Sequence, residues 1–491
     1  MHVFMQSASR WLNEPLKGMV RKHVPGSVFY DDFDDFPKNA EIVFEFCDGW
    51  AENQHFAVVS AAEKALINAY PSSSALGRKS YLSRVIEYWT AKNPDSILKT
   101  HSPMTICLSL DYCEYVDEAL TAADDLTLFY SLEQNESQPP EKREWWILKP
   151  ALMDCGADIR IFSTMEELAS HLESADDDLD EEEEEEEEFV AEEAETNSKP
   201  TADEKPDGMN NFSPSLSTPG LDSLDALVTA VERTNISRAP PGMDSSIKER
   251  AYVSEEGGRI RSSEIRDFVA QRYITAVLPL EKRKWHVRAY VLAVGRLKVY
   301  VSREMLALLA LEDYEPPWLN PSLKSSLTNT ALQTEEDFTR RESMRDFWAL
   351  PDDLLPGDSG EAGKGRNWKD RVFDEICAVS AELFRAAVHT MADKFTTVDK
   401  CFELFGVDFL IDTDGTPWLL EANETPAFYH QGVAGPLALR LMESVILVAM
   451  EHMGLARPPT EEDEQARKQL IEVLDETNNL AKSNITEIMP S

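Results

Sequence analysis

The chain has 491 residues, 42% of them hydrophobic, and a formal net charge of -42, to which the stretch 176–195 contributes fifteen acids. So much negative charge disfavours direct binding to nucleic acid or to a membrane surface, whereas the hydrophobic content suffices for two to four folded units. Scattered cysteines without zinc-ligand spacing, and the absence of an apolar leader or a membrane-length segment, predict a cytosolic or nucleocytoplasmic protein with reduced thiols.

Residues 1–85 are predicted to form a small N-terminal α/β domain. The piece "EIVFEFCDGW" is typical of a strand, and a helical pattern follows that ends in "SYLSRVIEYWTAKNP". Arg78 and Lys79 form a rare basic point in this acidic chain, for which the simplest interpretation is a solvated helix start.

A central unit is predicted over 86–172 and 251–279, because "TICLSLDYCEYV" and "EWWILKP" are apolar runs of strand length. Between its two parts, 173–250 is rich in acids, Ser, Thr and Pro, which predicts a disordered insertion. Lys149 closes the second strand, and the loop "MDCGADI" with Gly156 follows it. Such a pair suits phosphate binding, although a solubilising lysine at a strand end is the simpler alternative.

A C-terminal unit is predicted over 280–455, where "KWHVRAYVLAVGRLKVYVSREM" indicates a hairpin that turns near Gly295. Alternation places Lys284, His286 and Arg288 on one face of its first strand, with Arg303 at the end of the second. These cations suit phosphate or carboxylate contacts, or else cross-strand ion pairs with the many acids.

Two long amphipathic helices are predicted in this unit. They are "RNWKDRVFDEICAVSAELFRAAVHTMADKF" and "GPLALRLMESVILVAMEHMG", the second with a C-cap glycine at Gly454. The remaining residues, 456–491, are predicted to be an acidic tail.

Between those helices, "FGVDFLIDTDGTPWLLEANETP" has two apolar strands joined at an Asp-Gly turn. Asp408 lies on the first strand, and Glu421 and Asn423 lie two residues apart on the second, so they share a face. Pairing of the strands would gather three hard oxygen ligands, which suits a nucleotide-bound Mg²⁺. The alternative is that these side chains cap strand ends or face solvent.

Taken in order, "EWWILKP", "FVAQRYI", "KWHVRAYVLAVGRLKVYVSRE", "LTNTALQ" and "FELFGVDFLIDTDGTPWLLEANETPA" resemble the tubulin tyrosine ligase family of ATP-grasp enzymes. Within that family the chain is most similar to fungal P-body-associated proteins that carry the domain. The resemblance implies an α/β (α+β) ATP-grasp fold that holds a nucleotide between two β-sheets, with ATP and Mg²⁺ as cofactors.

The resemblance also implies the site residues. Asp408, Glu421 and Asn423 would hold the metal, and Arg288, Arg303 and Glu421 would be catalytic. The residues that it places around the nucleotide and the acceptor pocket are Lys149, Gly156, Gln271, Arg272, Tyr273, Ile274, Lys284, His286, Thr328 and Asn329. The chain departs from the family at Cys155 and Asp158 in the phosphate loop, at His286, and at Ser326, and a carboxylate at position 158 would repel phosphate.

In this family ATP phosphorylates a carboxylate and an amine then displaces the phosphate, leaving an amide. The implied partners are a free amino acid and a protein or peptide carboxylate acceptor, with tubulin as one candidate. Because the chain is acidic, an acidic tubulin tail would meet repulsion except at basic residues such as Arg78, Lys79, Lys282, Arg283 and Lys284. The alternative is a weak or inactive ATP-grasp adaptor of P-body, messenger-ribonucleoprotein or cytoskeletal assemblies, whose acidic segments recruit basic partners.

Overall fold

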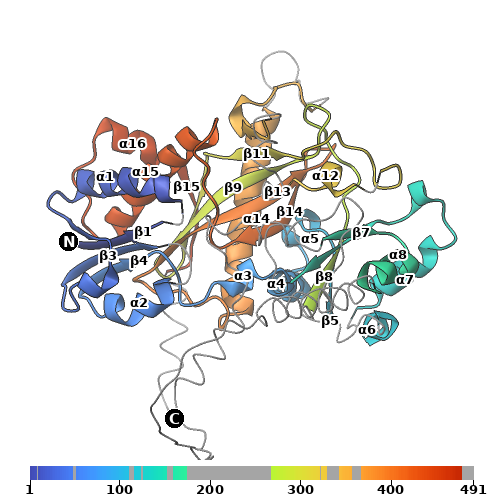
Figure 1. Ribbon diagram of the computed structural model, residues 1–491, viewed down its shortest axis with the longest axis horizontal. Coiled ribbons are helices and arrows are strands. Elements are labelled where there is room, and N and C mark those ends of the chain that lie inside the picture. The colour runs from blue at the N-terminus through green and yellow to red at the C-terminus, as the bar shows by residue number, and fades with distance from the viewer. Residues whose placement is uncertain are drawn as a thin grey trace, which may run out of the picture.

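Three β-sheets follow one another along the longest axis of the molecule, as the computed structural model in Figure 1 shows. The structure describes residues 1–7, 9–47, 51–109, 116–122, 125–151, 159–173, 267–320, 322–328, 342–355 and 367–477, with only the backbone at 51–54 and 172–173. The predicted insertion therefore lies outside the described residues, apart from its first residue. No helix among the described residues is long and apolar enough to cross a membrane.

The N-terminal sheet is parallel, with the order β2-β1-β3-β4. Its strands are β1 (His2–Gln6), β2 (Val28–Tyr30), β3 (Ile42–Cys47) and β4 (Lys64–Ile67). Its helical segments are η1 (Arg10–Leu12), α1 (Asn13–His23), η2 (Phe33–Asp35) and α2 (Ala51–Ser60).

The segment that leaves this sheet forms α3 (Ser74–Gly77), α4 (Lys79–Lys92) and α5 (Leu98–His101). The domain boundary predicted at residue 85 is wrong, because it falls inside α4. This helix packs against α14 (Trp368–Thr390) of the C-terminal unit, so it belongs to the body of the molecule. Helical periodicity alone does not reveal which unit a helix packs against.

The small sheet is antiparallel, with the order β5-β8-β6-β7. Its strands are β5 (Thr105–Ser109), β6 (Trp146–Pro150), β7 (Arg160–Phe162) and β8 (Asp267–Arg272). Its helices are α6 (Val116–Ala122), α7 (Thr127–Asn135), η4 (Pro140–Lys142) and α8 (Met165–Glu173). Leu148, Phe162 and Phe268 pack beneath these helices, which leaves Lys149 and Gln271 on the opposite face.

The large sheet is built around β9 (Trp285–Val294), which pairs with β13 along one edge and with β10 and β11 along the other. Its other strands are β10 (Lys298–Ser302), β11 (Leu306–Leu309), β12 (Met344–Asp346), β13 (Phe402–Ile411) and β14 (Pro417–Asn423). Two short helical segments lie beside it, α12 (Leu323–Ser326) and η6 (Phe347–Ala349). The predicted hairpin at Gly295 is confirmed by the β9–β10 pairing.

Long helices cover both faces of the large sheet. Val287 and Val291 of β9 belong to the core that α14 covers, whereas Tyr290 and Leu292 face α15 (Ala434–His452). The two predicted amphipathic helices are therefore confirmed. Gly454 has φ +66°, as expected of a glycine just beyond a helix end.

The prediction of a tail over 456–491 is wrong as far as Asp475. Residues 461–467 form α16 (Glu461–Arg467), and β15 (Leu470–Asp475) pairs antiparallel with β10 at the edge of the large sheet. Acid-rich composition hid this strand, but Leu470 and Leu474 are buried, and the acid Asp475 pairs with Lys298 at 3.0 Å. The residues from 478 lie outside the described residues.

We expect Leu474→Asp to lower the free energy of unfolding by about 3 kcal/mol, because it places a charge among the apolar side chains beneath α14. Urea unfolding followed by circular dichroism measures the change. Glu472→Gln on the exposed side of the same strand is the matched control and should change little. Equal stability of both variants and the wild type would contradict the packing of β15.

Candidate functional site

The strands β9, β13 and β14 bring the polar residues of the site onto one face of the large sheet. Asp408 is the register partner of Glu421 on β14 and of Arg288 on β9, and Gly406 is the partner of Asn423. Directly opposed residues of a sheet point to the same side, so Asp408, Glu421, Asn423 and Arg288 share a face. The predicted pairing of the two strands across the Asp-Gly turn is confirmed.

Asp408 and Arg288 form a bidentate ion pair at the centre of this face. Arg288 donates from Nε to Asp408 Oδ1 at 2.5 Å and from Nη2 to Oδ2 at 2.9 Å. Burial opposes the charged form of Asp408, but the charges of Arg288 and His286 hold its pKa well below the ordinary range. For Arg288, burial likewise opposes the charge, and the Asp408 carboxylate raises the pKa above its ordinary value. Both groups are therefore charged.

The strand β13 has a glycine opposite Asn423 because the arginine passes close to the backbone there. A Cβ atom at Gly406 would lie 3.0 Å from Arg288 Cδ and 3.0 Å from Pro426 Cβ. The side-chain amide of Asn423 donates to the Gly406 carbonyl at 3.3 Å and lies 3.5 Å from Asp408 Oδ2. Gly406 therefore lets the arginine lie flat against the sheet beside Asp408.

His286 contacts both this cluster and Thr328, a residue predicted to lie around the nucleotide and the acceptor pocket. Its Nε2 lies 3.5 Å from Asp408 Oδ1, and its Nδ1 lies 2.5 Å from the hydroxyl of Thr328. Both His286 and Thr328 are buried. Asn329, the next residue, lies outside the described residues.

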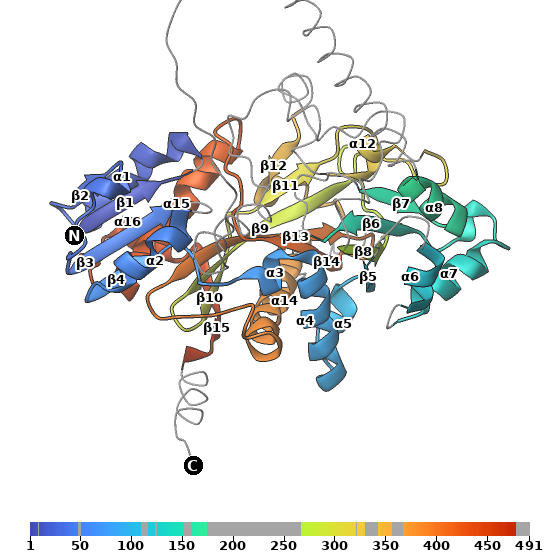
Figure 2. The same ribbon diagram turned by 60° about the horizontal axis from the view of Figure 1, so that its bottom comes forward.

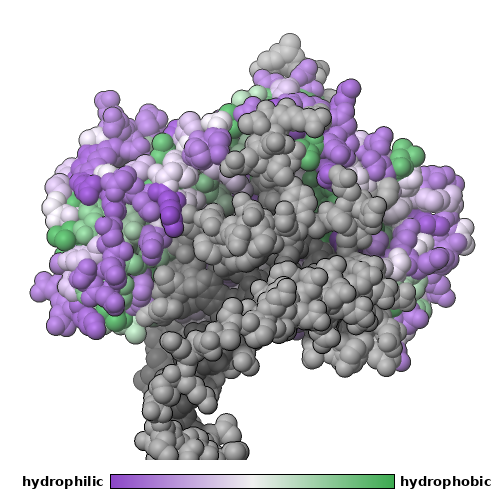
Figure 3. Space-filling model, viewed as in Figure 1, coloured by the Kyte–Doolittle hydropathy of each residue, from purple (hydrophilic) through white to green (hydrophobic). Residues whose placement is uncertain are grey.

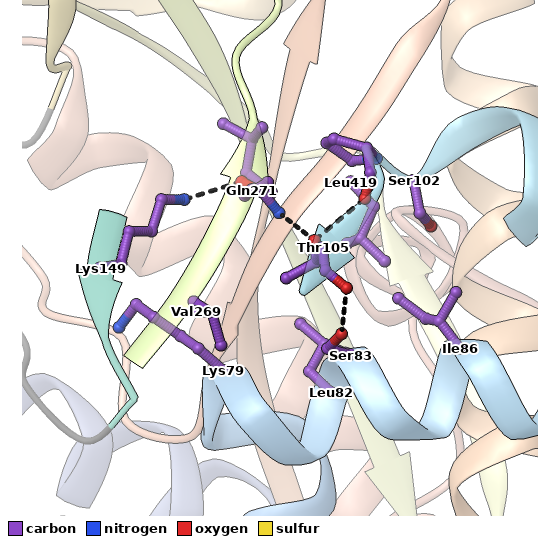
Figure 4. Close-up of a pocket in the computed structure, with 12 residues that line it drawn as sticks. Lys79, Leu82, Ser83, Ile86, Ser102, Thr105, Lys149, Val269, Gln271 and Leu419 are labelled. Carbon is purple, nitrogen blue, oxygen red and sulfur yellow. Dashed lines mark hydrogen bonds between the residues drawn. The ribbon is translucent and has the colours of Figure 1, made fainter. Parts of the chain in front are cut away.

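Lys149 reaches toward this face from the small sheet. Its Nζ donates to Gln271 Oε1 at 2.9 Å, and Gln271 in turn donates to the hydroxyl of Thr105 at 3.2 Å, as Figure 4 shows. Burial lowers the pKa of Lys149 to about 8, and the carboxylates of Glu421 and Asp408 partly oppose that effect. The pKa of Lys149 on the small sheet therefore depends on two carboxylates of the large sheet.

Two further lysines surround the same space. The ammonium of Lys284 lies 4.0 Å from the centroid of the Tyr273 ring, and burial lowers its pKa to about 7. Lys79, at the start of α4, lies 3.8 Å from Glu421 Oε2. Lys79 is therefore not part of a solvated helix start, and the basic pair that it forms with Arg78 in an acidic chain is the sequence signal that could have indicated a site here.

The space beside Lys149 and Gln271 is small. These two residues, with Lys79, Ser83 and Leu419, line a cavity of about 20 Å³ (Figure 4), which is room for about one water molecule. Pockets for cofactors measure several hundred Å³. This cavity by itself is therefore too small to hold a nucleotide.

The other predicted site residues are placed as follows. Arg303 is not brought to this face: its guanidinium is 3.2 Å from Asp370 of α14 and lies over the rings of Trp348 and Phe373. Arg272 points outward to Glu144 at 3.1 Å, Tyr273 is buried, and Ile274 is half-buried. Gly156, with Cys155 and Asp158 of the same loop, lies outside the described residues.

The donor set fits Mg²⁺ that is shared with a nucleotide. Asp408 and Glu421 offer carboxylate oxygens and Asn423 an amide oxygen, and Arg288 uses only part of the acceptor capacity of Asp408. Among the described residues, no group of three or more His, Cys, Asp or Glu side chains could hold a metal ion. An ion here would need oxygens from a substrate or water to complete its octahedron.

Comparisons with known proteins identify the family of the chain. The model of the tubulin-tyrosine ligase family matches residues 59–465. The chain belongs to the tubulin-tyrosine ligase family. A probable tubulin–tyrosine ligase of Schizosaccharomyces pombe is 34% identical over 365 residues, which cover 74% of this chain and 72% of that protein.

Two further comparisons show how much of the chain this similarity covers. The probable tubulin–tyrosine ligase PBY1 of Saccharomyces cerevisiae is 28% identical over 86% of this chain, which spans about half of that protein's length, 48%. The crystal structure of the C-terminal domain of K. lactis Pby1, described as an ATP-grasp enzyme that interacts with the mRNA decapping enzyme Dcp2, superposes with a TM-score of 0.58 at 23% identity. That match covers 96% of this chain and 99% of the other. The predicted ATP-grasp fold is confirmed.

Proposed function

We propose that this tubulin-tyrosine ligase family member is an ATP- and Mg²⁺-dependent ligase that joins a free amino acid to a protein or peptide carboxylate. The observation that carries the proposal is the shared face of Asp408, Glu421 and Asn423, with Arg288 beside them. Lys79, Lys149 and Lys284 surround the same space, so cations outnumber the two carboxylates, which suits a triphosphate.

In the proposed reaction the acceptor carboxylate attacks the γ-phosphorus of ATP, which releases ADP and forms an acyl phosphate. The amino group then attacks the carbonyl carbon, the bond from that carbon to the phosphate oxygen breaks, and the amine loses a proton as the amide forms. Bound Mg²⁺, held by Asp408, Glu421 and Asn423, would neutralise phosphate charge. Arg288 would bind a terminal phosphate, and Lys149 and Lys284 would hold the remaining phosphates in line with the acceptor.

The names of the relatives support tubulin as one candidate acceptor. Besides the probable tubulin–tyrosine ligases, a human relative named tubulin polyglutamylase TTLL6 is 28% identical over 33% of this chain. Cytoplasmic location with P-body association is part of the proposal and is supported by the description of K. lactis Pby1 as a partner of a decapping enzyme. Possible acceptors therefore include proteins other than tubulin.

A second candidate function is an ATP-grasp adaptor without ligase activity, and Asp158 in the predicted phosphate loop favours it, because a carboxylate there would repel phosphate. Release of phosphate from ATP, assayed with amino acids and pools of carboxylate-bearing peptides, discriminates between the two. The ligase must release phosphate in proportion to the acceptor supplied. Nucleotide binding without acceptor-dependent release would favour the adaptor, and no nucleotide binding at all would exclude the ligase.

We expect the affinity for MgATP to fall as the pH rises from 7 to 9. Free Lys284 and Lys149 have pKa values lowered by burial to about 7 and about 8, and a bound polyphosphate favours their charged forms and so raises both values. Binding therefore takes up protons in this pH range. Each lysine lowers the affinity by up to about tenfold per pH unit as the pH rises, and below pH 7 this contribution levels off.

Isothermal titration calorimetry measures this linkage. Titrations in two buffers of different ionisation enthalpy give the number of protons taken up at each pH. A dissociation constant that stays unchanged between pH 7 and 9, with no proton uptake, would show that the two lysines do not contact the phosphates.

A further inference from the structure

The connection from the small sheet to the large sheet contains a turn with two non-glycine residues in the left-handed region. Glu281 has φ 52° and Lys282 has φ 67°. On either side of them, Leu280 and Arg283 exchange two backbone hydrogen bonds of 2.9 Å each. Left-handed backbone is unfavourable for a non-glycine residue, so other contacts must hold this turn.

Hydrogen bonds and ion pairs of two arginines hold the turn. Arg283 is fully buried and donates to the carbonyls of Ala310 at 3.2 Å and Glu342 at 3.0 Å. Its Nη2 also lies 3.1 Å from the carboxylate of Glu281. Arg345 on β12 binds both oxygens of the same carboxylate, at 3.0 and 3.1 Å. Glu281 is thus the common anion of two arginines, Arg283 in the turn itself and Arg345 on β12.

The turn leads directly into Lys284. The carbonyl of Lys282 accepts from Tyr314 N, and that of Lys284 accepts from Ala310 N, both at 2.8 Å. Two residues of the 310–314 segment therefore fix the backbone on either side of the buried arginine. From this fixed backbone the ammonium of Lys284 extends over the ring of Tyr273. In Figure 2 the connection lies between β8 and β9, at the junction of the two sheets.

We propose that Glu281, Arg283 and Arg345 are positioning residues that hold this left-handed turn and thereby orient Lys284 toward the nucleotide. The inference rests on the proposed function, because it assigns a task to Lys284 in nucleotide binding. None of the three positioning residues needs to touch the nucleotide. Their effect reaches it through the backbone that carries the lysine.

The test compares two isosteric variants in the full chain. Glu281→Gln keeps the shape of the side chain and removes the shared anion, whereas Glu342→Gln removes only a more exposed carboxylate 3.4 Å from Arg345. We expect the dissociation constant for MgATP, measured by calorimetry, to rise on the order of tenfold in Glu281→Gln and to stay unchanged in Glu342→Gln. Hydrogen exchange of the Ala310 and Tyr314 amides should speed up in the first variant alone.

A double variant separates turn geometry from charge. Adding Lys282→Gly to Glu281→Gln places a glycine at one of the two left-handed positions, so the turn should hold without its anion. The affinity for MgATP should then return to within about twofold of the wild-type value. Equal affinity in Glu281→Gln and the wild type, or no rescue by the glycine, would overturn this inference alone. A wild type that binds no nucleotide would overturn the proposed function together with it.

Discussion

Asp408→Asn is expected to lower the free energy of unfolding by about 3 kcal/mol. The asparagine keeps the size of the side chain but leaves the Arg288 guanidinium without its anion on a buried strand. Removing one partner of a buried ion pair costs about 3–5 kcal/mol, and the 17% exposure of the Arg288 side chain favours the lower end. Urea denaturation of the purified variant measures the change.

A double-mutant cycle measures the interaction between Arg288 and Asp408. Arg288→Met combined with Asp408→Asn removes both charges, so the double variant should be more stable than the sum of the single losses predicts, by about 1–3 kcal/mol. Asp414→Asn, on the exposed turn after β13, is the control for loss of an acid on the same hairpin. Additive losses would mean that the two side chains do not stabilise each other.

Glu421→Gln is expected to abolish the part of nucleotide affinity that depends on magnesium. Glu421 lies opposite Asp408, and its side chain is 26% exposed, so the amide should leave the fold intact. A neutral amide oxygen is a much weaker ligand for Mg²⁺ than a carboxylate oxygen. We expect calorimetry to give the same affinity for this variant with and without Mg²⁺, whereas the wild type should bind at least about tenfold more tightly with the ion.

Glu424→Gln is the control for this variant, since it lies three residues further along the chain and approaches Ser73 at 3.1 Å. Its magnesium dependence should match that of the wild type. A Glu421→Gln variant that keeps a full magnesium effect would remove Glu421 from the metal assignment, whatever the activity of the protein.

Local pattern was sufficient to predict the strands that carry the site. Alternation along "VDFLID" and "WLLEAN", with the Asp-Gly turn between them, predicted the pairing that places Asp408 opposite Glu421. The same reasoning predicted the hairpin of β9 and β10, because apolar β-prone runs of this length have few other arrangements. The order of the motifs, more than any one of them, indicated the ATP-grasp fold.

Features that depend on distant contacts could not be predicted in this way. Arg303 follows β10 and is held on the α14 side by Asp370, a contact between residues 67 positions apart in the sequence. The strand β15 was not predicted because its two acids, Glu472 and Asp475, are exposed, and only Leu470 and Leu474 of its six residues are fully buried. Lys79 meets Glu421 only because α3, directly before it in the chain, packs against β14, and no local periodicity encodes that contact.

The most direct test of the central claim is anomalous diffraction from crystals grown with Mn²⁺ and a non-hydrolysable ATP analogue. The proposed site predicts one strong manganese peak within coordination distance of Asp408, Glu421 and Asn423, beside the phosphates of the analogue. A nucleotide bound with its metal at other residues, or an analogue that fails to bind between the two sheets, would contradict the assignment.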